Sequence, residues 1–189
     1  MLKNILIALV VLILGFLGFV ATRPNDYKVE RSALVAAPPQ VVYAEVADFH
    51  KWNAWSPWEH LDPNMKRNIE GPESGTGAIY SWAGNEKAGE GRMTITEAEP
   101  AQRVGIKLEF IKPWASTSTT VFAFAPEGAG TRVNWTMTGK HDFMSKAMCV
   151  FMPMEKMVGP DFERGLASLD SVSAVAAVSA PGDSTTATP

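Results

Sequence analysis

The sequence is poor in the residues that most often build metal and redox sites. It has one cysteine, Cys149, and three histidines. A single thiol cannot form an internal disulfide, so cysteine content does not indicate the compartment. No metal-binding spacing connects His50, His60 and His141, and the HExxH motif is absent. We therefore expect no metal and no other cofactor, and we interpret Cys149, which lies in a methionine-rich apolar stretch, as buried packing.

Blocks of like charge are also missing. The chain carries 17 Lys and Arg against 20 Asp and Glu, a formal net charge of −3, and the two signs are mixed along it. A phosphate backbone requires a concentrated basic surface, so nucleic acid is excluded as a partner.

GxGxxG and nucleophile-elbow motifs are absent as well. The GTG at residues 75–77 and the GEG at residues 89–91 are typical of hairpin turns.

One long hydrophobic run is present at residues 5–21, with the sequence ILIALVVLILGFLGFVA. At about 1.5 Å per helical residue, this run reaches the lower end of a bilayer span. A cleaved signal peptide is the alternative, but Phe19 would then occupy the third position before a cut at Ala21, where signal peptides have a small residue. We expect residues 1–24 to form a retained anchor of a single-pass protein in a bacterial inner membrane.

Charges beside this run favour one orientation by a small margin. Lys3 and the amino terminus precede the run, whereas Arg23 and Lys28 follow it and are offset by Asp26 and Glu30. Positive charge is retained in the cytoplasm. We therefore expect the N-terminus to be cytoplasmic and the domain to lie outside the cytoplasm.

The other end of the chain has the composition of a disordered tail. Residues 179–189, SAPGDSTTATP, contain almost no large apolar side chain, so they cannot bury enough surface to become ordered. We assign residues 177–189 to this tail and residues 25–176 to a single domain. A domain of roughly 150 residues buries about two-thirds of the surface that its unfolded chain exposes, which is enough for one core.

Alternating apolar and polar residues predict a series of strands. In the clearest of them, Val104, Ile106, Leu108 and Phe110 share one face. Glycine, proline and asparagine separate the strands, and turns this short imply antiparallel pairing. The predicted strands are residues 27–36, 65–71, 78–83, 91–99, 104–110, 118–125 and 132–138.

Helical patterns flank the strands. After two prolines, residues 39–49 read as a short helix. Trp52, Trp55 and Trp58 follow, and their spacing suggests one aromatic face on a broken helix.

Two helices are predicted after the last strand. Asp142 can cap a helix over residues 143–152, in which methionines recur four apart. A second helix is predicted to begin at Pro160. Its apolar stripe consists of Phe162, Leu166 and Leu169.

Four segments carry a family resemblance: DFHKWNAWSPW at residues 48–58, GTGAIYSW at 75–82, GEGRMTI at 89–95 and DFERGLASL at 161–169. With them, residues 27–175 resemble the SRPBCC superfamily, which has the START-like or polyketide-cyclase-like helix-grip fold. The resemblance implies an α+β domain in which a curved antiparallel sheet wraps around a long C-terminal helix, here preceded by an N-terminal transmembrane helix. The superfamily includes lipid carriers, cyclases, hydroxylase domains and chaperone cofactors, so the fold alone does not determine the activity.

In that superfamily the sheet does not close completely on the helix, and the gap is an apolar cavity. We interpret the inward side chains as the lining of such a cavity; the alternative is that they fill an ordinary core. The resemblance thus implies membrane-tethered binding of a hydrophobic small molecule or lipid, without evident catalysis. The predicted ligand-binding residues are Tyr80, Trp82, Met93, Ile95, Leu108, Phe110, Phe122 and Trp135.

Two other functions stay open. A cyclase-like or hydrolase-like enzyme could use the same cavity, with Tyr80, Glu59 or His60 as acid or base. Such an enzyme requires a titratable group that faces the cavity with a shifted pKa. A protein-interaction module like the chaperone cofactors could instead dock a partner through the aromatic segment from Trp52 to Trp58.

Overall fold

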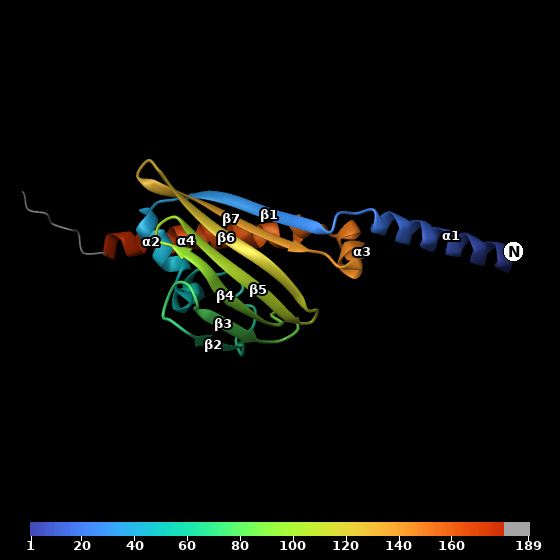
Figure 1. The fold of residues 1–189 in the computed structure, drawn as a ribbon, viewed down its shortest axis with the longest axis horizontal. Helices are drawn as coiled ribbons and strands as arrows, with labels where there is room; N and C mark the ends of the chain where they lie inside the picture. The colour runs from blue at the N-terminus through green and yellow to red at the C-terminus, as the bar shows by residue number, and fades with distance from the viewer. Residues whose placement is uncertain (180–189) are drawn as a thin grey trace, which may run out of the picture.

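Seven antiparallel strands form one sheet in the order β1-β7-β6-β5-β4-β3-β2 (Figure 1). Each strand from β2 to β7 pairs with its neighbours in sequence, and β1 pairs with β7, which confirms the predicted antiparallel meander. The computed structural model describes residues 1–179. The strands are β1 Asp26–Val35, β2 Lys66–Glu70, β3 Ile79–Ala83, β4 Glu90–Glu99, β5 Arg103–Lys112, β6 Ser116–Glu127 and β7 Gly130–Lys140.

Helices cover the concave face of this sheet at one side. The longest helix, α4, packs along β1 and against α2, and α2 in turn contacts β6 and the short 3₁₀ helix η1 (Figure 1). A curved antiparallel sheet that holds a long C-terminal helix confirms the predicted α+β helix-grip fold. The helices in the described residues are α1 Leu2–Ala21, α2 Pro39–Val46, η1 Phe49–Ala54, α3 Phe143–Phe151 and α4 Met154–Ser179.

The strand register explains why one face of the sheet is apolar. Ile106 on β5 lies opposite Ile95 on β4 and Thr120 on β6, and all three side chains are buried. Lys107, the next residue, points to the other face and is exposed. The predicted shared face is confirmed as part of the concave face; it consists of Val104, Ile106, Leu108 and Phe110.

α4 begins at Met154, earlier than the sequence predicted, and continues through Pro160. Proline is normally found in the first helical turn, because it has no N–H to donate. Here Arg31 on β1 contacts the helix on both sides of the proline: its Nε donates to Oε1 of Glu163 at 2.6 Å, and its guanidinium pairs with Glu155. Tertiary contacts therefore override the local signal, and the predicted helix start at Pro160 was wrong.

α1 extends away from the domain as a separate helix (Figure 1). Val20 is its only buried residue. Within the described residues, α1 is the one helix long and apolar enough to cross a membrane, a property that signal sequences near an N-terminus share. At the other end α4 reaches Ser179, so most of the predicted tail, residues 180–189, lies outside the described residues.

Candidate functional site

The concave face consists of rows of side chains that run across the strands. We number these rows from the end of the sheet nearest α3. Row one is Trp82, Gly91, Phe110 and Ser116. Row two is Tyr80, Met93, Leu108, Ser118, Gly139 and Tyr27. Row three is Ile95, Ile106, Thr120, Met137 and Val29, and row four is Val104, Phe122, Trp135 and Arg31. All eight predicted ligand-binding residues lie in these four rows.

Row four is closed by aromatic packing. The indole of Trp135 on β7 stacks on Phe162 of α4, with ring centroids 4.0 Å apart. The ring of Phe122, on the neighbouring strand β6, lies 4.6 Å from the same indole. Gly165 on α4 allows this approach, because a Cβ there would collide with the indole of Trp135. Side chains therefore fill the interior at this end of the sheet.

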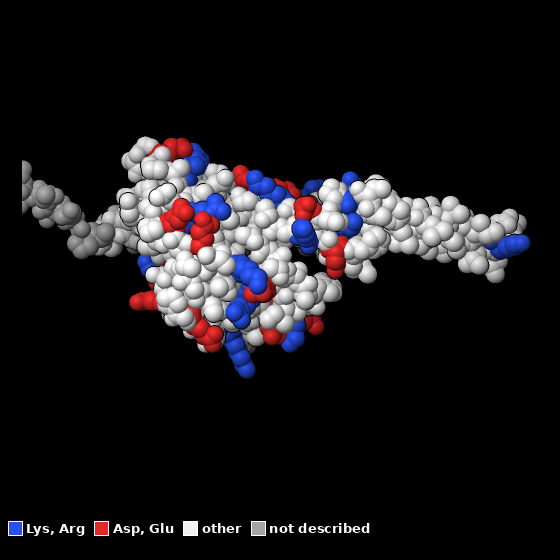
Figure 2. Space-filling model, in the orientation of Figure 1, with Lys and Arg blue, Asp and Glu red and all other residues white. Residues whose placement is uncertain are grey.

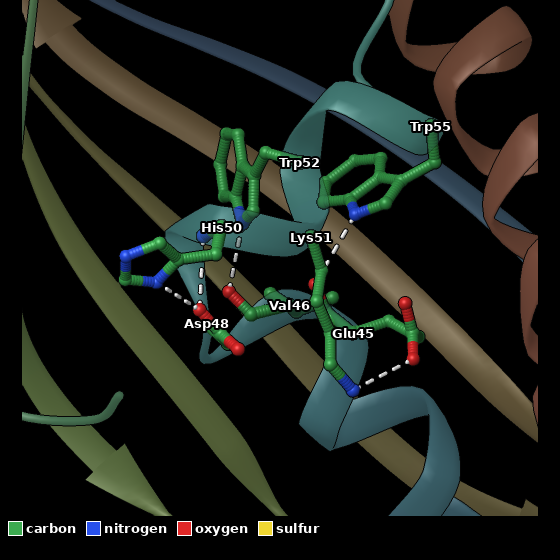
Figure 3. Close-up of polar contacts among 7 residues, drawn as sticks. All are labelled: Glu45, Val46, Asp48, His50, Lys51, Trp52 and Trp55. Carbon is green, nitrogen blue, oxygen red and sulfur yellow. Dashed lines mark hydrogen bonds and ion pairs between the residues drawn. The ribbon is translucent and has the colours of Figure 1, made fainter. Parts of the chain in front are cut away.

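Two tryptophans from η1 and the residue after it complete the closed end (Figure 3). The indole N–H of Trp52 donates to the carbonyl of Val46 at 2.9 Å, and that of Trp55 donates to the carbonyl of Glu45 at 3.2 Å. These carbonyls end α2, where they have no helical partner. Both indoles are 2 % exposed and contact Phe122 edge to face. The side chains of Trp52 and Trp55 thus belong to the core.

Row one is open. Phe110 is 36 % exposed, Ser116 is exposed, and Trp82 is half-buried. Trp82 lies over Gly91, where a Cβ would overlap its ring, and its indole N–H donates to the carbonyl of Ala88 at 3.0 Å. Trp82 and Phe110 meet edge to face at 6.0 Å. The concave face therefore changes from solid packing at row four to accessible aromatic surface at row one.

An open hollow lies at the same end of the sheet. Its volume is about 770 Å³, and it is lined by residues 26–28 of β1, 117–119 of β6 and 138–140 of β7. Most of these residues, among them Lys28, Thr119 and Thr138, alternate with the row-two residues and therefore belong to the convex face. Figure 2 shows an opening between the rounded body of the domain and the part of the molecule that carries α3.

Hydroxyl groups line β6 within this otherwise apolar face. Ser118 is 3 % exposed, and its hydroxyl lies 2.7 Å from the hydroxyl of Tyr27. One row deeper, the Thr120 hydroxyl accepts from the indole N–H of Trp135 at 2.9 Å and donates to the carbonyl of Thr136 at 3.0 Å. A hydroxyl both donates and accepts, so the Tyr27–Ser118 pair keeps capacity for one more polar partner, whereas Thr120 is already used in both roles.

Two of the predicted acid–base candidates, Glu59 and Tyr80, are hydrogen-bonded to each other. Glu59 is 4 % exposed; it accepts from the Tyr80 hydroxyl at 2.6 Å and from Nε of Arg67 at 2.7 Å. Burial, followed by the bond to Glu59, raises the pKa of Tyr80 above its ordinary value. Because the carboxylate is paired with a guanidinium and the phenol keeps its proton, this arrangement acts as a structural ion pair and leaves no free base.

The third acid–base candidate lies elsewhere. His60 is exposed, although it directly follows the buried Glu59. Within residues 1–179 no group of three or more His, Cys, Asp or Glu side chains is placed to hold a metal ion. Cys149 is half-buried on α3 rather than enclosed in a core.

A family model matches residues 26–174, which is the whole sheet and most of α4; its description is polyketide cyclase / dehydrase and lipid transport. The chain belongs to this family. Membership includes the helix-grip fold seen here and a hydrophobic ligand-binding architecture. No curated protein matches the chain.

Solved structures of other proteins share the fold at low identity. A protein of unknown function from Staphylococcus aureus has a TM-score of 0.59 at 10 % identity, covering 82 % of this chain and 97 % of its own. A Chromobacterium violaceum protein has a TM-score of 0.55 at 16 % identity, covering 79 % and 97 %. The Aha1 dimer of Colwellia psychrerythraea has a TM-score of 0.53 at 15 % identity, covering 82 % and 99 %. Identities this low establish the fold alone.

Sequence reasoning missed the hydroxyl pair in row two. A signal for Ser118 was present, because it shares the two-residue period of Phe122 on β6 and therefore the same face. Tyr27 carries no such signal. Its position over Gly139 follows from the pairing of β1 with β7, strands far apart in the sequence.

Proposed function

We propose that this protein is a membrane-tethered binding protein for a hydrophobic small molecule or lipid, held against the open end of the concave face. The observation that carries the proposal is the gradient of packing: Trp135 in row four is 2 % exposed and stacked, whereas Phe110 in row one is 36 % exposed. Large aromatic side chains left accessible on a concave surface are typical of ligand sites.

The predicted residues divide into two groups under this proposal. Those of the closed rows, Ile95, Phe122 and Trp135, form the floor of the site. Trp82 and Phe110 of row one and the half-buried Leu108 of row two contact the ligand, and the buried Tyr80 and Met93 of row two lie beneath it. Met93 is unbranched and can adapt to apolar groups of different shape.

The site favours a ligand that is apolar with one polar group. The aromatic surface of Trp82 and Phe110 suits a hydrocarbon chain or ring, and the Tyr27–Ser118 hydroxyl pair can bind one hydroxyl, carbonyl or carboxyl group. Binding of such a ligand does not need a carboxylate that acts as a base. Glu59 is already paired with Arg67, which supports binding without catalysis.

The tether in this proposal is α1. Its 20 residues include no acidic side chain, and only Val20 is buried against the rest of the chain. Residues 1–24 then form the anchor and residues 25–176 the binding domain, on the outer side of a bacterial inner membrane. An anchored domain stays close to the bilayer, which is the main source of apolar ligands.

A charged residue in row one tests the proposal. Phe110→Asp places a carboxylate at the site on the concave face. The control is Leu34→Asp, which places a carboxylate on the convex face of the sheet, where Leu34 of β1 is 50 % exposed. Binding of a fluorescent fatty acid to the full chain in detergent is the measurement. We expect Phe110→Asp to weaken binding about 10- to 100-fold, which corresponds to burial of one aromatic side chain, and Leu34→Asp to leave it unchanged. Equal affinities in the two variants, or no binding by the wild type, would contradict the proposal.

A further inference from the structure

α3 exposes an apolar face that the rest of the domain leaves uncovered. None of its residues is buried, and its only charged side chain is Lys146. Soluble surfaces rarely gather large apolar side chains in this way. The exposed residues of α3 and its C-cap are Phe143 at 46 %, Met144 at 74 %, Met148 at 41 %, Phe151 at 79 % and Met152 at 55 %.

The position of α3 relative to α1 indicates what covers this face. The ring of Phe151 lies 5.8 Å from that of Phe16 on α1, and the amide of His141 donates to the carbonyl of Asn25 at 2.7 Å. Phe16 precedes Ala21, the last residue of α1, by roughly 8 Å of helix. A helix that lies in a membrane interface buries its apolar face by about 5–10 Å. If α1 spans a bilayer, α3 is therefore held at the depth of an interfacial helix.

A second apolar group lies at the same end of the sheet. The β5–β6 hairpin exposes Ile111 at 50 % and Trp114 at 72 %. Its tip extends beyond row one, and Figure 1 places it on the side of the domain from which α3 and α1 extend. Tryptophan is enriched at membrane–water interfaces, because its ring is apolar and its N–H is polar.

We propose that the exposed face of α3 and the tip of the β5–β6 hairpin lie in the interface of the leaflet that α1 enters. We call these residues the membrane-contact surface; they are Phe143, Met144, Met148, Phe151, Met152, Ile111 and Trp114. Row one opens at this end of the sheet, so the site faces the lipid. An apolar ligand then moves between bilayer and site without crossing bulk water. This inference rests on the membrane tether of the proposed function.

Site-directed spin labelling of the full chain in phosphatidylcholine vesicles tests the proposal. In a Cys149→Ser background, single labels replace Met144, Phe151 or, as the matched control, Val178, which is 87 % exposed on α4. We expect labels at 144 and 151 to be more accessible to oxygen, which partitions into lipid, than to a water-soluble nickel complex. The label at 178 should show the reverse order.

Three other outcomes would each contradict one part of the proposal. Labels at 144 and 151 that match the control would leave the tether in place but exclude membrane contact by α3. Labels shielded from both reagents would mean that a protein partner or a second copy covers the face. A chain that does not float with vesicles would remove the tether itself. None of these readouts depends on a bound ligand, so they are separate from the fatty-acid experiment.

A label-free measurement guards against a perturbed fold. Brominated phosphatidylcholine quenches tryptophans that reach the acyl chains, and Trp114 is by far the most exposed tryptophan of the membrane-contact end. We expect the wild type to be quenched in such vesicles and Trp114→Phe to lose most of that quenching. An unquenched wild type, or quenching unchanged in Trp114→Phe, would exclude contact by the hairpin.

Discussion

Trp135 on β7 and Phe162 on α4 stack face to face, with their ring planes inclined by only 8°. The pair fixes the helix to the sheet at row four, and both side chains are almost completely buried. The same contact determines where space remains, because the helix and its aromatic neighbours fill one end of the concave face and leave row one free. The stability of the domain and the location of the site thus have a common origin.

Phe162→Ala should therefore lower the free energy of unfolding by about 3–5 kcal/mol, since the cavity it creates lies in a closed aromatic cluster. Denaturation of the full chain in detergent, followed by tryptophan fluorescence, measures the effect. Leu34→Ala, which removes an exposed side chain, is the control and should cost less than about 1 kcal/mol. A small loss in Phe162→Ala would mean that the cluster does not hold α4 in place.

Gly91→Ala should disturb the packing of row one, at the open end of the concave face, and leave the aromatic packing of row four unchanged. A methyl group at this position meets the ring of Trp82 and the carbonyl of Glu109, so we expect a loss of about 1–3 kcal/mol and a more exposed Trp82. Gly105→Ala is the matched change, because its new methyl group meets only side-chain atoms of Glu97 and Thr96. Red-shifted tryptophan emission in the first variant alone is the expected result; identical spectra would contradict the placement of Trp82.

Glu59→Gln should destabilise the fold rather than abolish a reaction. The substitution removes the charged partner of Arg67 but keeps an acceptor for the Tyr80 hydroxyl, so the expected loss is about 1–3 kcal/mol. Glu73→Gln, an exposed site, serves as the control. Fatty-acid binding should persist in both variants. Unchanged stability together with lost function would instead indicate that Glu59 acts in catalysis.

Alkaline pH should weaken the fold through Tyr80. Its pKa is raised in the folded state by burial and by the bond to Glu59, whereas the unfolded phenol titrates near 10. The stabilisation is therefore complete below about pH 10 and is lost as pH rises further, because only the unfolded state then releases the proton. Unfolding free energies between pH 9 and 11 should fall by up to about 1.4 kcal/mol per pH unit more in the wild type than in Tyr80→Phe. Parallel pH profiles in the two proteins would show that Tyr80 is not buried as described.

The two-residue period of the strands predicted the antiparallel sheet, and the family resemblance implied the helix-grip fold and the face on which the candidate site lies. Each predicted ligand-binding residue, from Tyr80 on β3 to Trp135 on β7, lies on the concave side. The sequence could not show which of them are covered. Coverage depends on the path of α4, which approaches the sheet where Gly159 and Gly165 leave room for Arg31 and Trp135. Such contacts join β1 or β7 to a helix far along the chain, so no local pattern records them.

Photo-crosslinking tests the central claim most directly, because it locates the ligand rather than only detecting it. The full chain in vesicles is irradiated with a diazirine-bearing fatty acid, and labelled peptides are mapped by mass spectrometry. We predict that the label is attached to residues of rows one and two, above all Trp82, Leu108 and Phe110. Labelling confined to α1 or to the convex face, with these rows unmodified, would contradict the account.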